Sequence, residues 1–119
     1  MTPSQIMPSL FGDVISTFMG VPKATDPNAT DAEVVVSGVP FDLACSGRSG
    51  TRMGPNAIRQ STANLIWEGK RWPWDFALEE RLRVSDAGNL DYAYGEPESL
   101  VDNLETHAMR WLKAGKKML

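Results

Sequence analysis

Two carboxylates lie close together in the run Asp86-Ala-Gly-Asn-Leu-Asp91. The run follows residues 82–86, whose alternation of apolar and polar side chains predicts a strand. Ligands of α/β folds bind at the carboxyl ends of strands, and carboxylate oxygens can hold a hard cation there. One short acidic turn fixes no metal geometry, however, and such a turn more often caps the strand through an Asx hydrogen bond. We therefore interpret Asp86 as a strand cap, and we assign no metal to it or to Asp91.

A glycine-rich loop, residues 45–55, carries Arg48 and Arg52 just before a predicted helix. Arginine side chains near a helix N-terminus can attract an anion such as phosphate. The loop has neither the G-x-x-x-x-G-K-[ST] nor the G-x-G-x-x-G spacing that indicates nucleotide binding. We expect both arginines to form salt bridges, within the chain or between subunits, and neither to be catalytic.

Cys45 and His107 are the only thiol and the only imidazole, so a nucleophile–base pair has to be considered. His107 lies three residues after Leu104 and seven after Leu100, which places it on or beside the buried stripe of a predicted helix. We expect a packed or boundary histidine and a small loop cysteine without thiol chemistry.

Aromatic and basic side chains are mixed in the segment 67–76, as they are in proteins that bind single-stranded nucleic acid. The residues concerned are Trp67, Lys70, Arg71, Trp72, Trp74 and Phe76. Glu68 and Asp75 interrupt the segment, and the formal net charge of the chain is −3. Because a nucleic-acid footprint needs a basic face, we expect the segment to pack against a neighbouring protein surface, and we expect no nucleic-acid partner.

The elements that position these residues alternate between strand and helix. Pro40 ends a β-branched run, Pro55 and Pro97 each suit a first helical position, and Gly115 provides a stop. The predicted elements are a strand over 32–38, a helix over 55–68, a strand over 82–86 closed by Gly88, a helix from 97 to about 115, and the start of a strand at 116–119. This order predicts an α/β fold with a parallel sheet and flanking helices, in which residues 33–39 and 82–86 lie side by side.

The apolar faces of the two predicted helices can be read from the spacing of their residues. The first would bury Ile58, Ala63, Leu65 and Ile66; the second would bury Leu100, Leu104, Ala108 and Leu112, with Trp111 adjacent. Residues 1–32 contain several prolines and no sustained period, so we expect an extended N-terminal arm that docks on the domain or on a neighbouring subunit. Residues 33–119 would belong to a single α/β domain.

The 119 residues suffice for one domain at most, and several properties bear on where the chain resides. A single cysteine allows no internal disulfide, and the N-terminus lacks the charged and apolar regions of a signal peptide. No apolar run approaches the ~18 residues of a membrane span. We expect a cytoplasmic protein without a membrane partner.

The string GVPFDLACSGRSGTRMGPNAIRQ, residues 38–60, resembles the N-terminal region of the ureohydrolase family of arginases and agmatinases, and agmatinases most closely. The similarity continues through STANLIWE, RWPWDF, ERL, VSDAGNLD and AGKKML, so nearly the whole chain after residue 30 is covered. The resemblance implies an arginase-like three-layer α/β fold, present here only in part. It also places the glycine-rich loop at a subunit or active-site rim.

Family members hydrolyse a guanidino C–N bond with two manganese ions, so the resemblance implies conversion of agmatine and water to putrescine and urea. The Gly-Gly-Asp-His, Asp-Ala-His-x-Asp and Asp-x-Asp segments that supply the family's metal ligands have no counterpart in residues 1–119. Asn89 stands where agmatinases usually have aspartate, which weakens a carboxylate role there. We therefore expect an N-terminal portion that ends before the metal site and is inactive alone. No catalytic, cofactor-binding or metal-ligating residue is assigned to it.

Two alternatives stay open at this point. The chain could be a non-catalytic partner subunit of a full-length ureohydrolase, or part of a relative that acts on guanidinobutyrate or guanidinopropionate. The resemblance also implies a homo-oligomer, a trimer or hexamer. A parallel sheet that is cut through its middle leaves unpaired backbone groups on one strand, so we expect the chain alone to be marginally stable.

Overall fold

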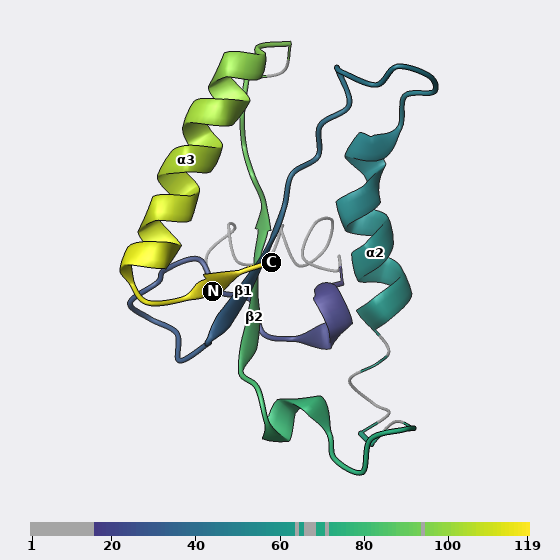
Figure 1. Cartoon of the computed structure of the whole chain (residues 1–119), viewed down its shortest axis with the longest axis vertical. Helices are drawn as coiled ribbons and strands as arrows, with labels where there is room; N and C mark the ends of the chain where they lie inside the picture. The colour runs from purple at the N-terminus through teal and green to yellow at the C-terminus, as the bar shows by residue number, and fades with distance from the viewer. Residues whose placement is uncertain (1–15, 64, 66–68, 71, 94) are drawn as a thin grey trace, which may run out of the picture.

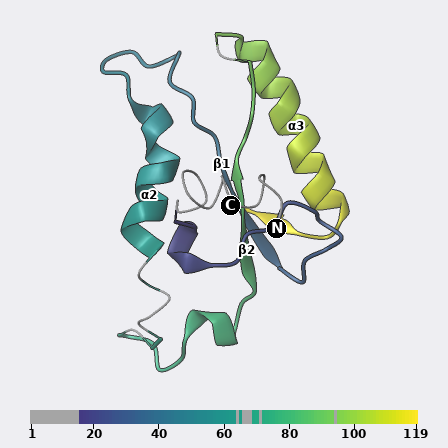
Figure 2. The same ribbon diagram turned by 180° about the vertical axis from the view of Figure 1, so that it is seen from behind.

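The computed structural model describes residues 16–63, 65, 69–70, 72–93 and 95–119. Within them three strands, β1 (Val34–Gly38), β2 (Val84–Asn89) and β3 (Lys117–Met118), form a parallel sheet. The order of the strands in the sheet is β2-β1-β3. Helices α2 (Gly54–Thr62) and α3 (Pro97–Lys113) lie on opposite sides of the strands (Figure 1), and the reverse view in Figure 2 shows the same arrangement. The predicted α/β fold with a parallel sheet is confirmed.

The pairing of β1 with β2 confirms that residues 33–39 and 82–86 lie side by side, because Val34 pairs with Val84 and Val36 with Asp86. Gly88, however, does not close the second strand as predicted. β2 runs on to Asn89, and the ladder shows an irregular register between Val36 and Gly38 of β1. Gly88 has φ 81°, a conformation that glycine adopts without strain, so it bends the strand within the ladder instead of ending it.

The described part of the N-terminal arm, residues 16–32, pairs with the outer edge of β2 through residues 22–24. The Asp86 N–H donates to the Pro22 carbonyl at 2.8 Å, and the Ala24 N–H donates to the Asp86 carbonyl at 3.0 Å. A 3-10 turn, Phe18–Gly20, precedes this contact, and its Met19 N–H donates to Thr62 Oγ1 at 3.0 Å. Residues 22–24 therefore cover the β2 edge of the sheet at Asp86. Residues 1–15 of the predicted arm lie outside the described residues.

A small apolar core lies between the sheet and α3. Its buried members are Ala24, Ala32, Val35 and Trp111, with Ala87 and Met118 packed against them. Trp111 is fully buried, whereas Leu112, predicted to face the core, is 53% exposed. Leu100 is buried as predicted, so the buried stripe departs from the predicted one toward the carboxyl end of the helix, where Trp111 takes the place of Leu112. We attribute the burial of Trp111 in place of Leu112 to the indole ring, whose large apolar area gains more from burial than a leucine side chain does.

Helix α2 is shorter than predicted and faces the sheet differently. The α-helical part ends at Thr62, short of the predicted Glu68, and residues 64 and 66–68 lie outside the described residues. Ile58, expected in the core, is 53% exposed, while its neighbour Arg59 is only 5% exposed. The prediction was therefore wrong for Ile58, because the partner of Arg59 on β2 turns Arg59 toward the sheet. Ala63 and Leu65 are half-buried, and Ile66 lies outside the described residues.

Helix α3 begins at Pro97 as predicted and leads directly into the third strand. Gly115 has φ 82°, and the N–H groups of Gly115 and Lys116 donate to the carbonyls of Leu112 and Trp111. These bonds satisfy carbonyls at the helix end, and the chain turns back toward the sheet. None of the helices in the described parts of the chain has the length and apolar character needed to cross a membrane.

Candidate functional site

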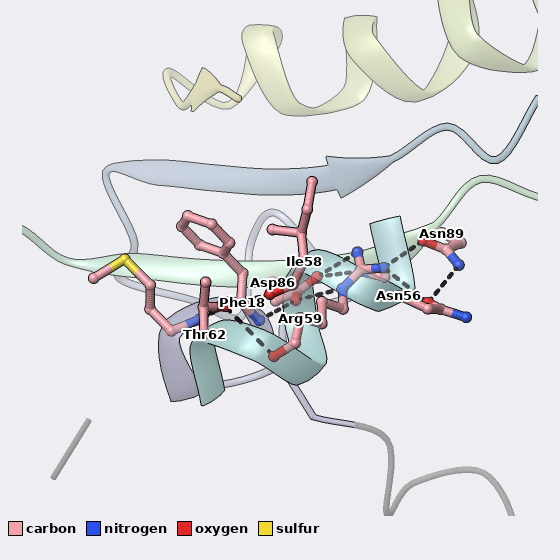
Figure 3. Close-up of polar contacts among 9 residues, drawn as sticks. Phe18, Asn56, Ile58, Arg59, Thr62, Asp86 and Asn89 are labelled. Atoms are coloured by element: carbon pink, nitrogen blue, oxygen red, sulfur yellow. Dashed lines mark hydrogen bonds and ion pairs between the residues drawn. The ribbon is translucent and has the colours of Figure 1, made fainter. Parts of the chain in front are cut away.

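A buried ion pair joins Arg59 of α2 to Asp86 in the middle of β2 (Figure 3). Arg59 Nε donates to Asp86 Oδ2 at 2.8 Å, and Arg59 Nη2 donates to Asp86 Oδ1 at 3.0 Å. The two side chains are only 6% and 2% exposed. Two parallel charge-assisted hydrogen bonds between buried side chains make this the strongest polar contact between α2 and the sheet.

Two asparagines extend the ion pair toward the end of β2. Arg59 Nη1 donates to Asn89 Oδ1 and to Asn56 Oδ1, the latter at 3.3 Å, and Asn89 Nδ2 donates to Asn56 Oδ1 at 3.0 Å. The amide of Asn89 accepts from the guanidinium and donates to Asn56 at the same time. An ionised carboxylate could only accept, so asparagine suits this position.

Asp86 is held in its ionised form. Its Oδ2 accepts from the Phe18 N–H and its Oδ1 from the Gly88 N–H, both at 2.8 Å. Burial alone would raise the pKa of Asp86, but the hydrogen bonds from Arg59 and from these two backbone N–H groups outweigh it and lower the pKa. The bond to Gly88 has the predicted Asx pattern, but β2 continues to Asn89, so the bond lies within the strand and the prediction that it caps the strand was wrong. Asp86 is therefore an ionised anchor and not a proton carrier at neutral pH.

Gly38 at the end of β1 lets these parts come together. A Cβ at this position would lie 2.8 Å from the Pro55 Cβ and would also collide with the Asn89 side chain. Only glycine allows the start of α2 and the end of β2 to approach β1 so closely. The four residues Asn56, Arg59, Asp86 and Asn89, called the Arg59 network below, therefore fix β2 against α2, next to the end of β1 at Gly38.

The residues of the Arg59 network do not fit a pair of manganese ions. No group of three or more His, Cys, Asp or Glu side chains that could hold a metal occurs among the described residues. The carboxylate of Asp86 is already saturated by donors, and Asp91 is exposed and outside the network. A cavity of about 300 Å³ lies beside the network. Its lining consists of the four network residues and of others that include Ser16, Thr17, Lys23 and Thr25. The network thus acts as a brace and offers no free acid, base or nucleophile.

The other candidate residues of the sequence lie elsewhere. Arg52 forms an intrachain salt bridge to Asp42 at 2.7 Å, as predicted, and Arg48 is exposed on the same loop. Cys45 Sγ lies 3.3 Å from Thr51 Oγ1 within the glycine-rich loop. His107 instead contacts Ser37 and Trp111, so the structure does not pair it with Cys45.

The contact between His107 and Ser37 was missed by the sequence analysis. His107 Nε2 lies 2.8 Å from Ser37 Oγ, and both burial and the nearby Arg110 charge lower the pKa of His107. Ser37 lies two residues after Val35, so strand alternation alone places it on the side of the sheet that α3 covers. None of the ion pairs between described residues orients the imidazole, so the contact serves to hold α3 on β1.

The described part of the aromatic segment forms a small stack on the surface. The rings of Trp74 and Phe76 are stacked with their centres 5.9 Å apart, and the Arg81 guanidinium lies 4.3 Å from the centre of the Phe76 ring. Trp72 is 94% exposed, whereas Trp67 and Arg71 lie outside the described residues. Packing of this segment against a neighbour stays a prediction.

The model of the Arginase family matches residues 32–119, which include the whole Arg59 network. The chain belongs to the arginase family. This arginase-family chain is 53% identical to the agmatinase of Sodalis glossinidius over 102 residues, which are 86% of this chain and 33% of that relative. It is 45% identical to the agmatinase of Proteus mirabilis over 118 residues, 99% of this chain and 37% of the relative.

Solved structures give the same result for the fold. A hypothetical agmatinase from Burkholderia thailandensis superposes with a TM-score of 0.77 at 35% identity, over 87% of this chain and 32% of that one. Proclavaminate amidino hydrolase from Streptomyces clavuligerus superposes with a TM-score of 0.69 at 30% identity, over 83% of this chain and 32% of that one. The arginase-family chain therefore spans about a third of the length of the curated relatives it matches.

Sequence reasoning missed Arg59, the central residue of the site. The sequence does contain a signal, because Asn56 and Arg59 are three residues apart and therefore share one face of the helix. That face can be recognised as polar and buried only when a partner is known. The predicted position of Asp86 in a buried strand would have required a cationic partner of this kind.

Proposed function

We propose that this chain forms part of an agmatinase-type hydrolase, which converts agmatine and water to putrescine and urea. The observation that carries the proposal is the identity of 53% to the Sodalis agmatinase over 86% of this chain. Within such an enzyme the Arg59 network would brace β2 against α2 up to Asn89 at the carboxyl end of the strand, the edge at which α/β folds place their ligands.

The proposal includes two manganese ions as the cofactor of the complete enzyme. Manganese supplies a Lewis acid and an activated water in hydrolases of this kind. Because the described residues of this chain do not fit the ions, their ligands belong to another part of the enzyme. The residues of this chain order the sheet on which that part is built, and we propose that the 119 residues alone release no urea.

A second substrate class is favoured by one observation. The Streptomyces neighbour with a TM-score of 0.69 is named for proclavaminate, so the fold is shared with a hydrolase for another amidino compound. A relative that acts on guanidinobutyrate or guanidinopropionate is therefore the alternative to an agmatinase.

The remaining parts of the proposal concern organisation. Residues 1–32 form an arm and residues 33–119 part of one α/β domain. The complete enzyme is a cytoplasmic homo-oligomer, a trimer or hexamer, and Cys45 as the single cysteine needs no oxidising compartment. A non-catalytic partner subunit of a full-length ureohydrolase is the alternative, and the 94% exposed Trp72 favours it as a contact residue.

A chimera tests the proposal. The matched third of the Sodalis agmatinase is replaced by the matched 102 residues of this chain, and urea release is measured with agmatine, guanidinobutyrate and guanidinopropionate in the presence of Mn²⁺. We expect turnover with agmatine above the other two. A folded chimera that releases no urea from any of them would contradict the function, and a preference for a guanidino acid would favour the alternative substrate class. The intact Sodalis agmatinase serves as the positive control.

A further inference from the structure

The segment that follows β1, residues 41–52, is tied together at its two ends and is called the β1 loop below. Asp42 Oδ2 accepts from the Gly50 N–H at 3.0 Å and from Arg52 Nη1 at 2.7 Å. Gly50 has φ 135°, a conformation that suits glycine, and the Asp42 side chain is only 9% exposed. A compact segment whose ends touch is an Ω-loop, a type of surface loop that often carries function. Asp42 is therefore the residue that closes the β1 loop.

The base of the β1 loop is fixed to the segment that follows the neighbouring strand. Thr51 Oγ1 donates to the Phe41 carbonyl at 2.9 Å, and Tyr92 Oη donates to the Pro40 carbonyl at 2.7 Å. The rings of Phe41 and Tyr92 meet edge to face, with their centres 6.2 Å apart. Tyr92 lies between β2 and α3, and Figure 1 shows this segment and the β1 loop beyond the same edge of the sheet.

The position of the β1 loop suits a binding role. The loop lies beyond the carboxyl ends of parallel strands, where α/β folds bind their ligands. Between its tied ends, residues 46–49 are exposed. The Arg52 side chain is 52% exposed, and an ion pair in contact with solvent contributes little to the stability of a fold. The bonds of Asp42 therefore order the loop more than they stabilise the domain, and an ordered loop binds a ligand at a lower entropic cost.

We propose that Asp42 is a positioning residue for the agmatinase-type reaction, because it holds the β1 loop in the conformation that binds the substrate. The inference rests on the proposed function, which places a guanidino substrate at this edge. The described residues of the chain do not fit the metal ions, so the loop would contact the substrate away from the bond that is cleaved. Asp42 itself is nearly buried and acts through the loop.

A KM-against-kcat comparison tests this role in the chimera with the Sodalis agmatinase. A loop that is closed in only part of the molecules lowers the apparent affinity in proportion to the closed fraction. Asp42→Ala loses both bonds, so we expect KM for agmatine to rise about tenfold while kcat stays within about twofold. Asp42→Asn keeps an oxygen for the Gly50 N–H and should raise KM less. Asp102→Asn, an exposed position on α3, is the matched control and should leave both constants unchanged.

Limited proteolysis of the 119-residue chain measures the closing of the loop without reference to activity. Trypsin can cleave after Arg48 at the exposed part of the loop and after Arg110, which precedes the fully buried Trp111 within α3. Cleavage of a transiently opened segment follows the population of its open form. We expect Asp42→Ala to speed cleavage after Arg48 about tenfold and to leave cleavage after Arg110 unchanged.

The outcomes separate the role of Asp42 from the function. An unchanged rate after Arg48, or equal increases after Arg48 and Arg110, would overturn the inference, the latter because Asp42 would then serve only the global fold. A lower kcat at unchanged KM would overturn it as well. An active wild-type chimera whose KM does not respond to Asp42→Ala would overturn the inference and leave the proposed function intact, whereas a folded but inactive wild-type chimera would contradict both.

Discussion

Replacement of Arg59 by methionine tests the role of the Arg59 network most sharply. Methionine preserves much of the apolar stem of the side chain but removes the guanidinium, so the Asp86 carboxylate would remain 2% exposed without its cation. Removal of one partner from a buried ion pair costs about 3–5 kcal/mol. The Phe18 and Gly88 N–H groups still donate to Asp86, so we expect the lower end, about 3 kcal/mol of unfolding free energy.

Such a loss is large for a small domain, whose total stability is about 5–15 kcal/mol. With a urea m-value of about 1–1.5 kcal/mol/M, the midpoint of urea unfolding should fall by about 2 M. Circular dichroism at pH 7 follows the transition. Arg59→Lys keeps the charge but loses the two parallel hydrogen bonds, so its midpoint should lie between those of the wild type and Arg59→Met.

Arg52→Met is the matched control for Arg59→Met. Arg52 also forms an ion pair, with Asp42 at 2.7 Å, but its side chain is 52% exposed. An ion pair in contact with solvent contributes about 0–1 kcal/mol, so this variant should unfold close to the wild type. Equal losses for Arg59→Met and Arg52→Met, or a loss below about 1 kcal/mol for Arg59→Met, would refute the view that the network braces the fold.

Three further predictions follow from the same contacts. The pKa of Asp86 is lowered in the folded state, so its contribution to stability is complete above about pH 4 and is lost as the pH falls through the folded pKa. Arg59→Met removes one cause of the lowered pKa, so in an acid titration this variant should unfold at a higher pH than the wild type. Gly38→Ala should cost about 1–3 kcal/mol in urea unfolding, because its Cβ would meet Pro55 at 2.8 Å, while Gly47→Ala, with nothing within 4 Å, should not. Trp72→Ser should change the unfolding free energy of the monomer by less than about 0.5 kcal/mol, since Trp72 is 94% exposed; a larger loss would show that it packs within the chain.

Local signals in the sequence predict most of the fold. Pro55 and Pro97 mark the beginnings of two helices, and the turn at Gly115 follows from a left-handed conformation that glycine favours. The β-branched run before Pro40 identifies the central strand. These signals act over a few residues, so they can be read from the sequence without knowledge of the tertiary structure.

The rotation of each helix could not be predicted in this way. Ile58 and Leu112 satisfy an apolar stripe, yet the structure exposes both and buries their neighbours Arg59 and Trp111. Which face is buried depends on partners distant in sequence, such as Asp86 for Arg59, 27 residues away. The candidate site was therefore predicted only in part: the Asx turn at Asp86 is local, whereas the ion pair is not.

Binding of Mn²⁺ by the purified 119-residue chain tests the central claim most directly, namely that this chain braces the sheet and another part of the enzyme binds the metal. Titration calorimetry at pH 7 to 8 and electron paramagnetic resonance of free Mn²⁺ measure the stoichiometry. We expect no stoichiometric Mn²⁺ in the wild-type chain, because no three ligand-type side chains converge among its described residues. Two tightly bound Mn²⁺ ions per chain, together with urea release from agmatine, would contradict the account.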